Sequence, residues 1–160
     1  MELTSEQLVK DISKVNVEDI LSCWQWRLSG MKAVITVSCM GDVFLLGDDD
    51  AVYWLQTGWG ELTKVADELQ QYEQFLTQQE KIGNWFRPVL VEKLLTAGKA
   101  LQESEVYSCK VPPSIGGEYS VDNIEAVDMS AHFGFTGQIC QQIKDLPSGT
   151  PVKIQYVDPK

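Results

Sequence analysis

Three short apolar runs, separated by residues that form turns, constrain the fold of this 160-residue chain more than any other feature of its sequence. The runs span residues 33–37, 43–46 and 51–55, and a Gly-Asp-Asp-Asp turn at 47–50 joins the last two. Short runs of apolar and β-branched residues bounded by Gly and Asp are typical of strands connected by hairpins. The segment therefore predicts an antiparallel meander.

Apolar residues at helical spacing follow the predicted strands. They recur every three or four positions over residues 62–79, which predicts an amphipathic helix there. A proline at 88 favours the first turn of a second apolar helix, over residues 88–97, and Gly98 would end it. A weaker helical pattern, interrupted by glycines, spans residues 133–143.

The N-terminal region carries signals for two short helices and one strand. Thr4 and Gln7 have the spacing of a capping box, so we expect a short helix over residues 4–14. Asn16 is a good N-cap for a second helical turn. Apolar and polar side chains alternate over residues 24–28, which is the period of a half-buried strand.

The second half of the chain alternates short strand patterns with turns. Strands are predicted over residues 106–111, 119–124 and 152–156, and the glycines at 116–117 are expected to allow positive φ or a close backbone approach. Taken together, the patterns predict an α+β fold: a single compact domain over residues 1–160, with an antiparallel sheet packed against amphipathic helices.

Acidic residues are concentrated in the first half of the chain. Thirteen Lys and Arg stand against 23 Asp and Glu, a net charge of −10. Residues 1–80 hold 5 basic and 14 acidic residues, a balance of −9, whereas residues 81–160 hold 8 and 9, a balance of −1. Such a field attracts cations and repels polyanions. We therefore expect no nucleic-acid or membrane partner and favour a basic one.

Cysteine usage predicts neither a disulfide framework nor a metal site. The four cysteines, Cys23, Cys39, Cys109 and Cys140, are widely scattered, and the chain has one histidine. Structural zinc sites need closely paired ligands. We expect no metal and no cofactor.

The charged residues of segment 1–14 do not fit a signal peptide, so the expected location is the cytoplasm.

One arrangement for nucleophilic catalysis is conceivable. Cys109 could pair with His132, with Asp128 or Asp145 orienting the imidazole, as in a small hydrolase-like enzyme. No local signature surrounds either residue, and a packed histidine is the alternative. A buried His132 away from any cleft would remove the hypothesis.

The acidic and aromatic residues of the meander suggest a partner-binding surface instead. Trp59 lies between two glycines, so we expect its side chain to be partly exposed, either as a binding anchor or as a lid over the core edge. The acidic turn lacks the spacing of a calcium loop and fits a hairpin tip better. The candidate contact residues are Asp42, Asp48, Asp49, Asp50, Trp59, Glu61 and, with less support, Glu118.

A family resemblance sharpens this hypothesis. Its motifs include Gly41-Asp42-x-Phe44, Val52-Tyr53-Trp54-Leu55, Gly60-Glu61-Leu62, Trp85-Phe86, Pro112-Pro113-x-x-Gly116-Gly117-Glu118-Tyr119, His132-Phe133 and Asp145-Leu146-Pro147-x-Gly149. Over about residues 20–155, the chain resembles the C-terminal domain of type VI secretion immunity proteins that neutralise a DNase toxin.

The resemblance implies a non-enzymatic cytoplasmic protein that binds a cognate toxin stoichiometrically. Relatives often carry a separate N-terminal domain, and residues 1–20 are too short to supply one. The matched glycines, prolines and tryptophans look like determinants of the fold, so no catalytic residue is carried over. A hydrolase-like enzyme and a scaffold or self-associating subunit stay open as alternatives.

Overall fold

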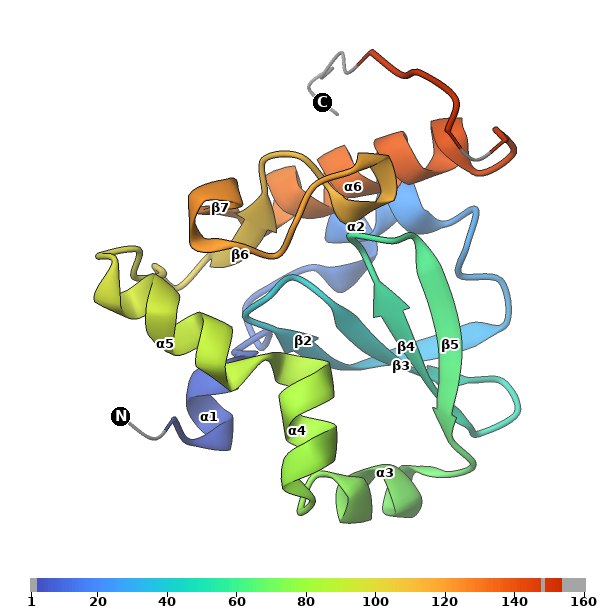
Figure 1. Cartoon of the computed structure of the whole chain (residues 1–160). Helices are drawn as coiled ribbons and strands as arrows, with labels where there is room; N and C mark the ends of the chain where they lie inside the picture. Colours follow the sequence, from blue (N-terminus) through green and yellow to red (C-terminus); the bar gives the residue numbers. More distant parts are fainter. Residues whose placement is uncertain (1–2, 148, 154–160) are drawn as a thin grey trace.

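The computed structural model describes residues 3–147 and 149–153 of the chain (Figure 1). Its main feature is a five-stranded antiparallel sheet with the strand order β1-β2-β3-β4-β5. These strands are β1 (Val9–Lys10), β2 (Met31–Ser38), β3 (Val43–Gly47), β4 (Val52–Gln56) and β5 (Glu61–Ala66). A second antiparallel sheet pairs β6 (Glu105–Cys109) with β7 (Ile124–Asp128).

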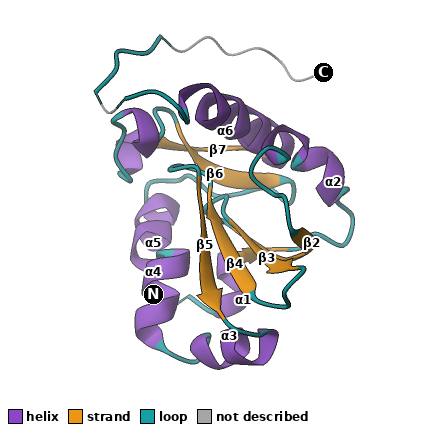
Figure 2. Ribbon diagram, turned by 90° about the vertical axis from the view of Figure 1, so that its right-hand side faces the viewer, coloured by secondary structure: helices purple, strands orange, loops and turns teal. Residues whose placement is uncertain are grey.

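Helices cover both sheets. In Figure 1, α6 lies across the top of the molecule beside β6 and β7, while α3, α4 and α5 follow one another along the lower and left sides; Figure 2 shows the same layers after a quarter turn. The helices are α1 (Ser5–Leu8), α2 (Val17–Ile20), α3 (Leu69–Phe75), α4 (Gln79–Phe86), α5 (Pro88–Thr96) and α6 (Met129–Ile143). The predicted α+β class, with an antiparallel sheet packed against helices, is confirmed.

The five-stranded sheet is buried on both faces along β3. Phe44 joins an aromatic cluster in which its ring centroid lies 5.1 Å from that of Tyr72 and 5.3 Å from that of Trp85. Val43 and Leu45, on the other face, pack in the cluster that contains Phe133 of α6. A strand that is buried on both faces needs apolar residues at every position, which explains the continuous apolar run.

Most of the predicted elements are present. The meander strands correspond to β2, β3 and β4, with the acidic turn as the hairpin tip between β3 and β4. The helix predicted over residues 88–97 is α5, which ends at Thr96, and residues 133–143 belong to α6. Asn16 caps α2 by accepting a hydrogen bond from the Asp19 N–H at 3.2 Å.

The helix predicted over residues 62–79 is wrong in its first part. Residues 61–66 form β5, and α3 starts only at Leu69. The spacing of Leu62, Val65 and Ala66 fits one face of a helix, but it also fits an irregular strand, because a bulge at Val65 places Leu62 and Ala66 against different core clusters. Pairing with β4 decides between the two, because it satisfies backbone groups that β4 would otherwise leave exposed.

The strand predicted over residues 24–28 is also wrong. A 3₁₀ turn, Ser22–Trp24, and further turns occupy this segment. The Trp24 and Trp26 rings stack with centroids 5.5 Å apart, and the Trp24 indole N–H donates to the Thr136 hydroxyl of α6 at 3.3 Å. Packing against a helix has replaced pairing in a sheet.

Four further boundaries differ from the prediction. The strand expected over residues 106–111 is β6, which starts at Glu105 and ends at Cys109. The helix expected over residues 4–14 ends at Leu8, because Val9 and Lys10 pair with β2, although the Thr4 N–H does donate to the Gln7 side chain at 2.8 Å. The strand expected over residues 119–124 is displaced to β7, after a 3₁₀ turn. Of the strand expected over 152–156, the first two residues are not in a strand, and 154–156 lie outside the described residues.

Candidate partner-binding surface

Asp42 lies in the interior, although the sequence placed it among the surface contacts. Its side chain is 5% exposed and accepts hydrogen bonds from the Thr57 N–H at 3.0 Å and from the Thr57 hydroxyl at 3.2 Å. Burial raises the pKa of the carboxyl to about 6, because it penalises the charged form. Asp42 therefore holds the end of β4 in place and cannot itself contact a partner.

His132 is buried beside Asp42 and its ring has protein partners at both nitrogens. Nε2 lies 2.9 Å from the Gly41 carbonyl oxygen and 3.0 Å from the Thr57 hydroxyl, while Nδ1 lies 2.7 Å from the Ser108 hydroxyl. A carbonyl only accepts, so Nε2 carries the proton and Nδ1 accepts from Ser108. Burial lowers the pKa of the imidazole to about 4, which keeps it neutral at pH 7.

The catalytic pair of Cys109 and His132 that the sequence made conceivable is therefore not formed. The ring contacts Ser108 and not its neighbour Cys109, and burial raises the pKa of the Cys109 thiol to about 11, which disfavours the reactive thiolate. Neither proposed orienting carboxylate is available. Asp128 caps α6 by accepting from the Ser130 N–H, and Asp145 pairs with Lys144.

The polar groups around His132 connect four parts of the fold. We name Gly41, Asp42, Thr57, Ser108 and His132 the buried polar centre; they come from the β2–β3 turn, the end of β4, β6 and α6. Gly41 has φ +78°, and a Cβ there would lie 2.3 Å from His132 Nε2. The contacts of this centre join the two sheets to α6, so its role is structural.

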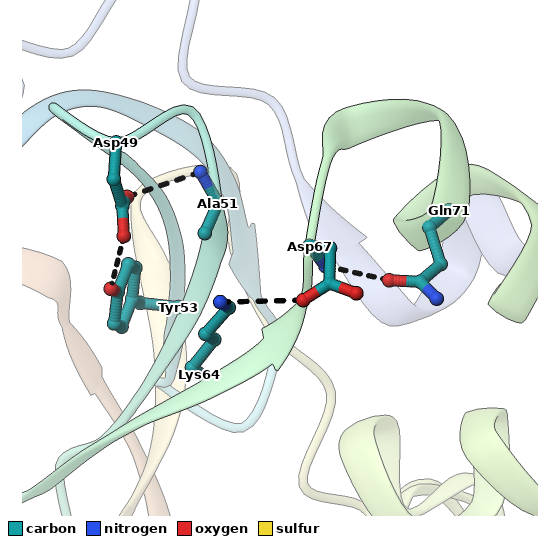
Figure 3. A network of polar contacts seen from close by, with 6 residues as sticks. All are labelled: Asp49, Ala51, Tyr53, Lys64, Asp67 and Gln71. Atoms are coloured by element: carbon teal, nitrogen blue, oxygen red, sulfur yellow. Dashed lines mark hydrogen bonds and ion pairs between the residues drawn. The ribbon is translucent and has the colours of Figure 1, made fainter.

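The hairpin tip between β3 and β4 is exposed and acidic. Asp48, Asp49 and Asp50 all face solvent, and Lys32 forms an ion pair with Asp50. Asp49 accepts hydrogen bonds from the Tyr53 hydroxyl at 2.7 Å and from the Ala51 N–H at 3.1 Å (Figure 3). The Tyr53 hydrogen bond, above all, holds the pKa of the Asp49 carboxyl below its ordinary value. The tip therefore carries negative charge at neutral pH.

Two more acids lie at the same end of the sheet. Because β4 and β5 are antiparallel and Val52 is paired with Ala66, the residues after β5 lie beside the hairpin tip. Asp67 is exposed; its carboxylate lies 3.3 Å from Lys64 Nζ, and its N–H donates to the Gln71 side chain at 2.6 Å (Figure 3). Glu68, at the N-cap of α3, is also exposed. We name Asp48, Asp49, Asp50, Asp67 and Glu68 the acidic end.

Sequence reasoning missed Asp67 and Glu68 because it placed both inside a helix. The available signal was their position directly before the apolar spacing of α3, where acidic residues are favoured by the helix dipole.

Trp59 lies at the opposite end of β4 and β5, in the turn that joins them. Its side chain is 47% exposed, as expected from the flanking glycines. A Cβ on Gly60 would lie 3.0 Å from Sγ of Cys140, so the turn is seated closely on α6. A surface hollow of about 270 Å³ adjoins the indole and is also lined by Arg27, Glu61 and Lys144. Trp59 is thus a fixed, partly exposed aromatic side chain between charges of both signs.

Glu118 is exposed in the loop between β6 and β7, near the Trp59 turn. The loop touches that turn, because a Cβ on Gly58 would lie 2.6 Å from the Tyr119 hydroxyl. Gly117 permits the loop to close, since a Cβ there would lie 1.6 Å from the Val111 carbonyl oxygen. The predicted close backbone approach at 116–117 is confirmed.

The structure thus divides the predicted contact residues into two exposed groups and one interior residue. Asp48, Asp49 and Asp50 lie at the acidic end, whereas Trp59, Glu61 and Glu118 lie at or near the other end of β4 and β5. Strand β5 connects the two groups.

Arg87 is a feature that sequence reasoning did not single out. It separates α4 from α5 in a left-handed conformation, with φ +52° and ψ +55°, directly before Pro88. Both the positive φ and the following proline make this conformation costly. Its guanidinium carbon lies 3.9 Å from the Tyr119 ring centroid, and its charge opposes the rise in the pKa of Asp42. The strained turn therefore accompanies a cation–π contact between Arg87 and Tyr119.

Within residues 3–147 and 149–153, no group of three or more His, Cys, Asp or Glu side chains is placed to hold a metal ion. In the same part of the chain, no helix combines the length and apolar character needed to cross a bilayer. What the described residues offer is a charged surface with one exposed indole, on an α+β protein whose one histidine is buried in a structural centre.

Part of this chain matches a known protein family. Residues 66–140 match the family model described as "T6SS immunity protein Tdi1, C-terminal". This match confirms the resemblance to type VI secretion immunity proteins over that segment. It contains Arg87, Gly117 and His132, whereas the hairpin tip and Trp59 lie outside it.

A solved structure has a similar fold. The crystal structure of Atu4351 from Agrobacterium tumefaciens superposes with a TM-score of 0.50 at 18% sequence identity. The similarity covers 77% of this chain and 64% of that one, so less than two thirds of Atu4351 is spanned. At this identity the likeness concerns the fold alone. A search of curated proteins finds no significant match.

Proposed function

We propose that this protein is a non-enzymatic immunity protein, which binds a cognate secreted toxin in the bacterial cytoplasm and neutralises it. The match of residues 66–140 to a type VI secretion immunity family is the observation that carries the proposal. The buried and neutral state of His132, hydrogen-bonded to Ser108 and Gly41, agrees with a structural role for the chain's one histidine.

The proposed partner is a basic nuclease toxin, in particular a DNase. A nuclease must attract the phosphate backbone and therefore presents Lys and Arg. The net charge of −10 and the exposed acids of the hairpin tip provide the complementary field. Electrostatic attraction of this kind accelerates association and makes its rate depend on salt.

The proposed contact surface consists of the exposed members of the predicted set: Asp48, Asp49, Asp50, Trp59, Glu61 and Glu118, with Asp67 and Glu68 added from the structure. Trp59 supplies the aromatic anchor that protein interfaces favour, and the acids supply steering. Asp42 is left out because its carboxylate is buried.

The test is capture of the toxin from the native host, followed by a titration of its nuclease activity. We expect a basic protein, full inhibition at one equivalent of immunity protein, and an association rate that falls about tenfold or more between low and high salt. An acidic partner, or a rate indifferent to salt, would contradict the electrostatic mechanism. Inactivation of many toxin molecules by one molecule of this protein would indicate an enzyme instead.

A further inference from the structure

Strand β5 is an edge strand, and its outer edge is open. The strand order ends at β5, and among the described residues β4 is the strand that pairs with it. In Figures 1 and 2 the outer side of β5 has neither a helix nor another strand laid along it, and α3 contacts only its end. Alternate N–H and C=O groups of an edge strand point outward without a strand partner.

Strand β5 has few of the features that usually prevent an edge strand from pairing with another chain. The strand has no proline, and its one basic residue, Lys64, has its charge directed toward Asp67 at 3.3 Å. The pairing passes from Val52–Ala66 to Tyr53–Lys64, which leaves Val65 as a bulge next to α3. Residues 61–64 therefore keep a regular edge, and the side chains of Thr63 and Lys64 are both exposed.

Acidic side chains stand at both ends of this edge. The acidic end, with Asp67 and Glu68, follows the last residue of β5, and Glu61 begins the strand beside Trp59. From Glu61 to Asp67 the chain covers roughly 20 Å at the rise of a strand. One extended segment of about seven residues, laid along β5, would therefore reach both exposed groups.

We infer that the outer edge of β5 binds an extended basic segment of the toxin as an added strand. The inference rests on the proposed function and assigns the mode of contact. Main-chain hydrogen bonds to β5 supply affinity, as in other cases of strand addition. Lys or Arg side chains at the two ends of the segment face the acidic end and Glu61, and Trp59 packs against the segment where it passes the β4–β5 turn.

A pair of peptides tests the backbone part of this inference without altering the protein. The first is a capped peptide of about ten residues that alternates Val or Thr with Lys or Arg, long enough to span β5. The second has the same sequence and charge but is N-methylated at every other residue, so it cannot complete a strand ladder. Amide hydrogen exchange of residues 61–66 is followed with each peptide at millimolar concentration.

We expect the first peptide to slow exchange of the outward amides of β5 about tenfold, and the N-methylated peptide to leave them unchanged. Equal effects of the two peptides would reduce the contact to charge alone and overturn the inference. Protection confined to residues 48–50, or no protection in β5, would overturn it as well.

The same exchange measurement on the captured toxin complex separates this inference from the proposed function. Neutralisation with protection of β5 supports both. Neutralisation without protection of β5 retains the immunity function and overturns the added strand. Failure to capture a toxin, together with selective protection by the first peptide, contradicts the function and leaves an edge that binds basic strands.

Discussion

Two groups of polar side chains in this protein both contain carboxylates, but they differ in burial and in role. In the buried polar centre, Asp42 and His132 are almost fully removed from water, and their hydrogen bonds join the two sheets to α6. At the acidic end, carboxylates such as Asp49 and Asp67 face solvent and make local contacts. Burial, more than residue type, therefore separates polar groups that hold the fold together from those that are accessible to a partner.

The largest effect is expected from Gly41→Ala, within the buried polar centre. The new Cβ would clash with His132 Nε2 at 2.3 Å and would also impose φ +78° on a residue that resists it. We expect the free energy of unfolding to fall by about 4 kcal/mol, measured by urea denaturation.

Gly30→Ala is the matched control. Gly30 has φ +83°, but nothing lies within 4 Å of its Cβ position. Its substitution should lower the free energy of unfolding by about 1 kcal/mol, because only the unfavourable positive φ contributes. Equal losses in the two variants would show that contact with His132 does not matter.

Asp42→Asn should change how stability depends on pH. The pKa of Asp42 is raised by folding from 3.8 to about 6, so its contribution is complete below pH 3.8 and is lost as pH rises to 6. The pKa of His132 is lowered from 6.5 to about 4, so its contribution is complete above pH 6.5 and is lost as pH falls to 4. As pH rises from 4 to 6, the Asp42 titration therefore lowers the stability of the wild type while the His132 titration raises it.

Removing the Asp42 titration leaves the His132 dependence uncompensated. Relative to wild type, the unfolding free energy of Asp42→Asn should rise by about 2 kcal/mol between pH 4 and pH 6. Denaturant titrations of both proteins across this range measure the difference, and other groups cancel in the subtraction. A difference independent of pH would show that Asp42 is not a buried titrating group.

Neutralising the hairpin tip should alter binding and not stability. The triple change Asp48→Asn, Asp49→Asn and Asp50→Asn removes three exposed charges, so association with the proposed basic toxin should slow about tenfold at low salt and converge with wild type at high salt. A matched triple change, Glu103→Gln, Asp122→Asn and Glu125→Gln, removes the same charge from exposed positions in the second half. If both variants slow association equally, net charge rather than the acidic end governs the rate.

The smallest effect concerns one hydrogen bond of the acidic end. Tyr53→Phe removes the hydroxyl that donates to Asp49 at 2.7 Å, so the pKa of the Asp49 carboxyl should rise back toward 3.8. A carbon-detected NMR titration of the Asp49 side chain measures the change. An unchanged pKa would leave the Ala51 N–H as the group that stabilises the carboxylate.

The sequence predicted elements well where one local pattern dominated. The acidic hairpin turn and the proline-started helix α5 are specified by neighbouring residues, and the structure has both. Prediction failed where tertiary contacts chose between two local possibilities, as at residues 62–66, where the apolar spacing suits a helix but pairing with β4 produces a bulged strand. It failed also at Trp24, because packing on α6 involves a residue more than 100 positions away.

The candidate site was predictable in type but not in arrangement. The exposure of Trp59 follows from its flanking glycines, and acidity follows from composition. The burial of Asp42 could not be foreseen, because its hydrogen-bond partner Thr57 lies 15 positions away, in the turn between β4 and β5. Likewise, Asp67 joins the hairpin tip only through the antiparallel pairing of β4 with β5.

The α+β class, most turns, the excess of negative charge and the resemblance to an immunity family follow from the sequence alone, because these depend on residue type and local spacing. Tertiary contacts determine which carboxylates are buried, that β5 is an open edge, and that most of the exposed candidate residues lie near its two ends. Those properties depend on contacts between distant segments, which fix burial and strand order and which no local pattern encodes.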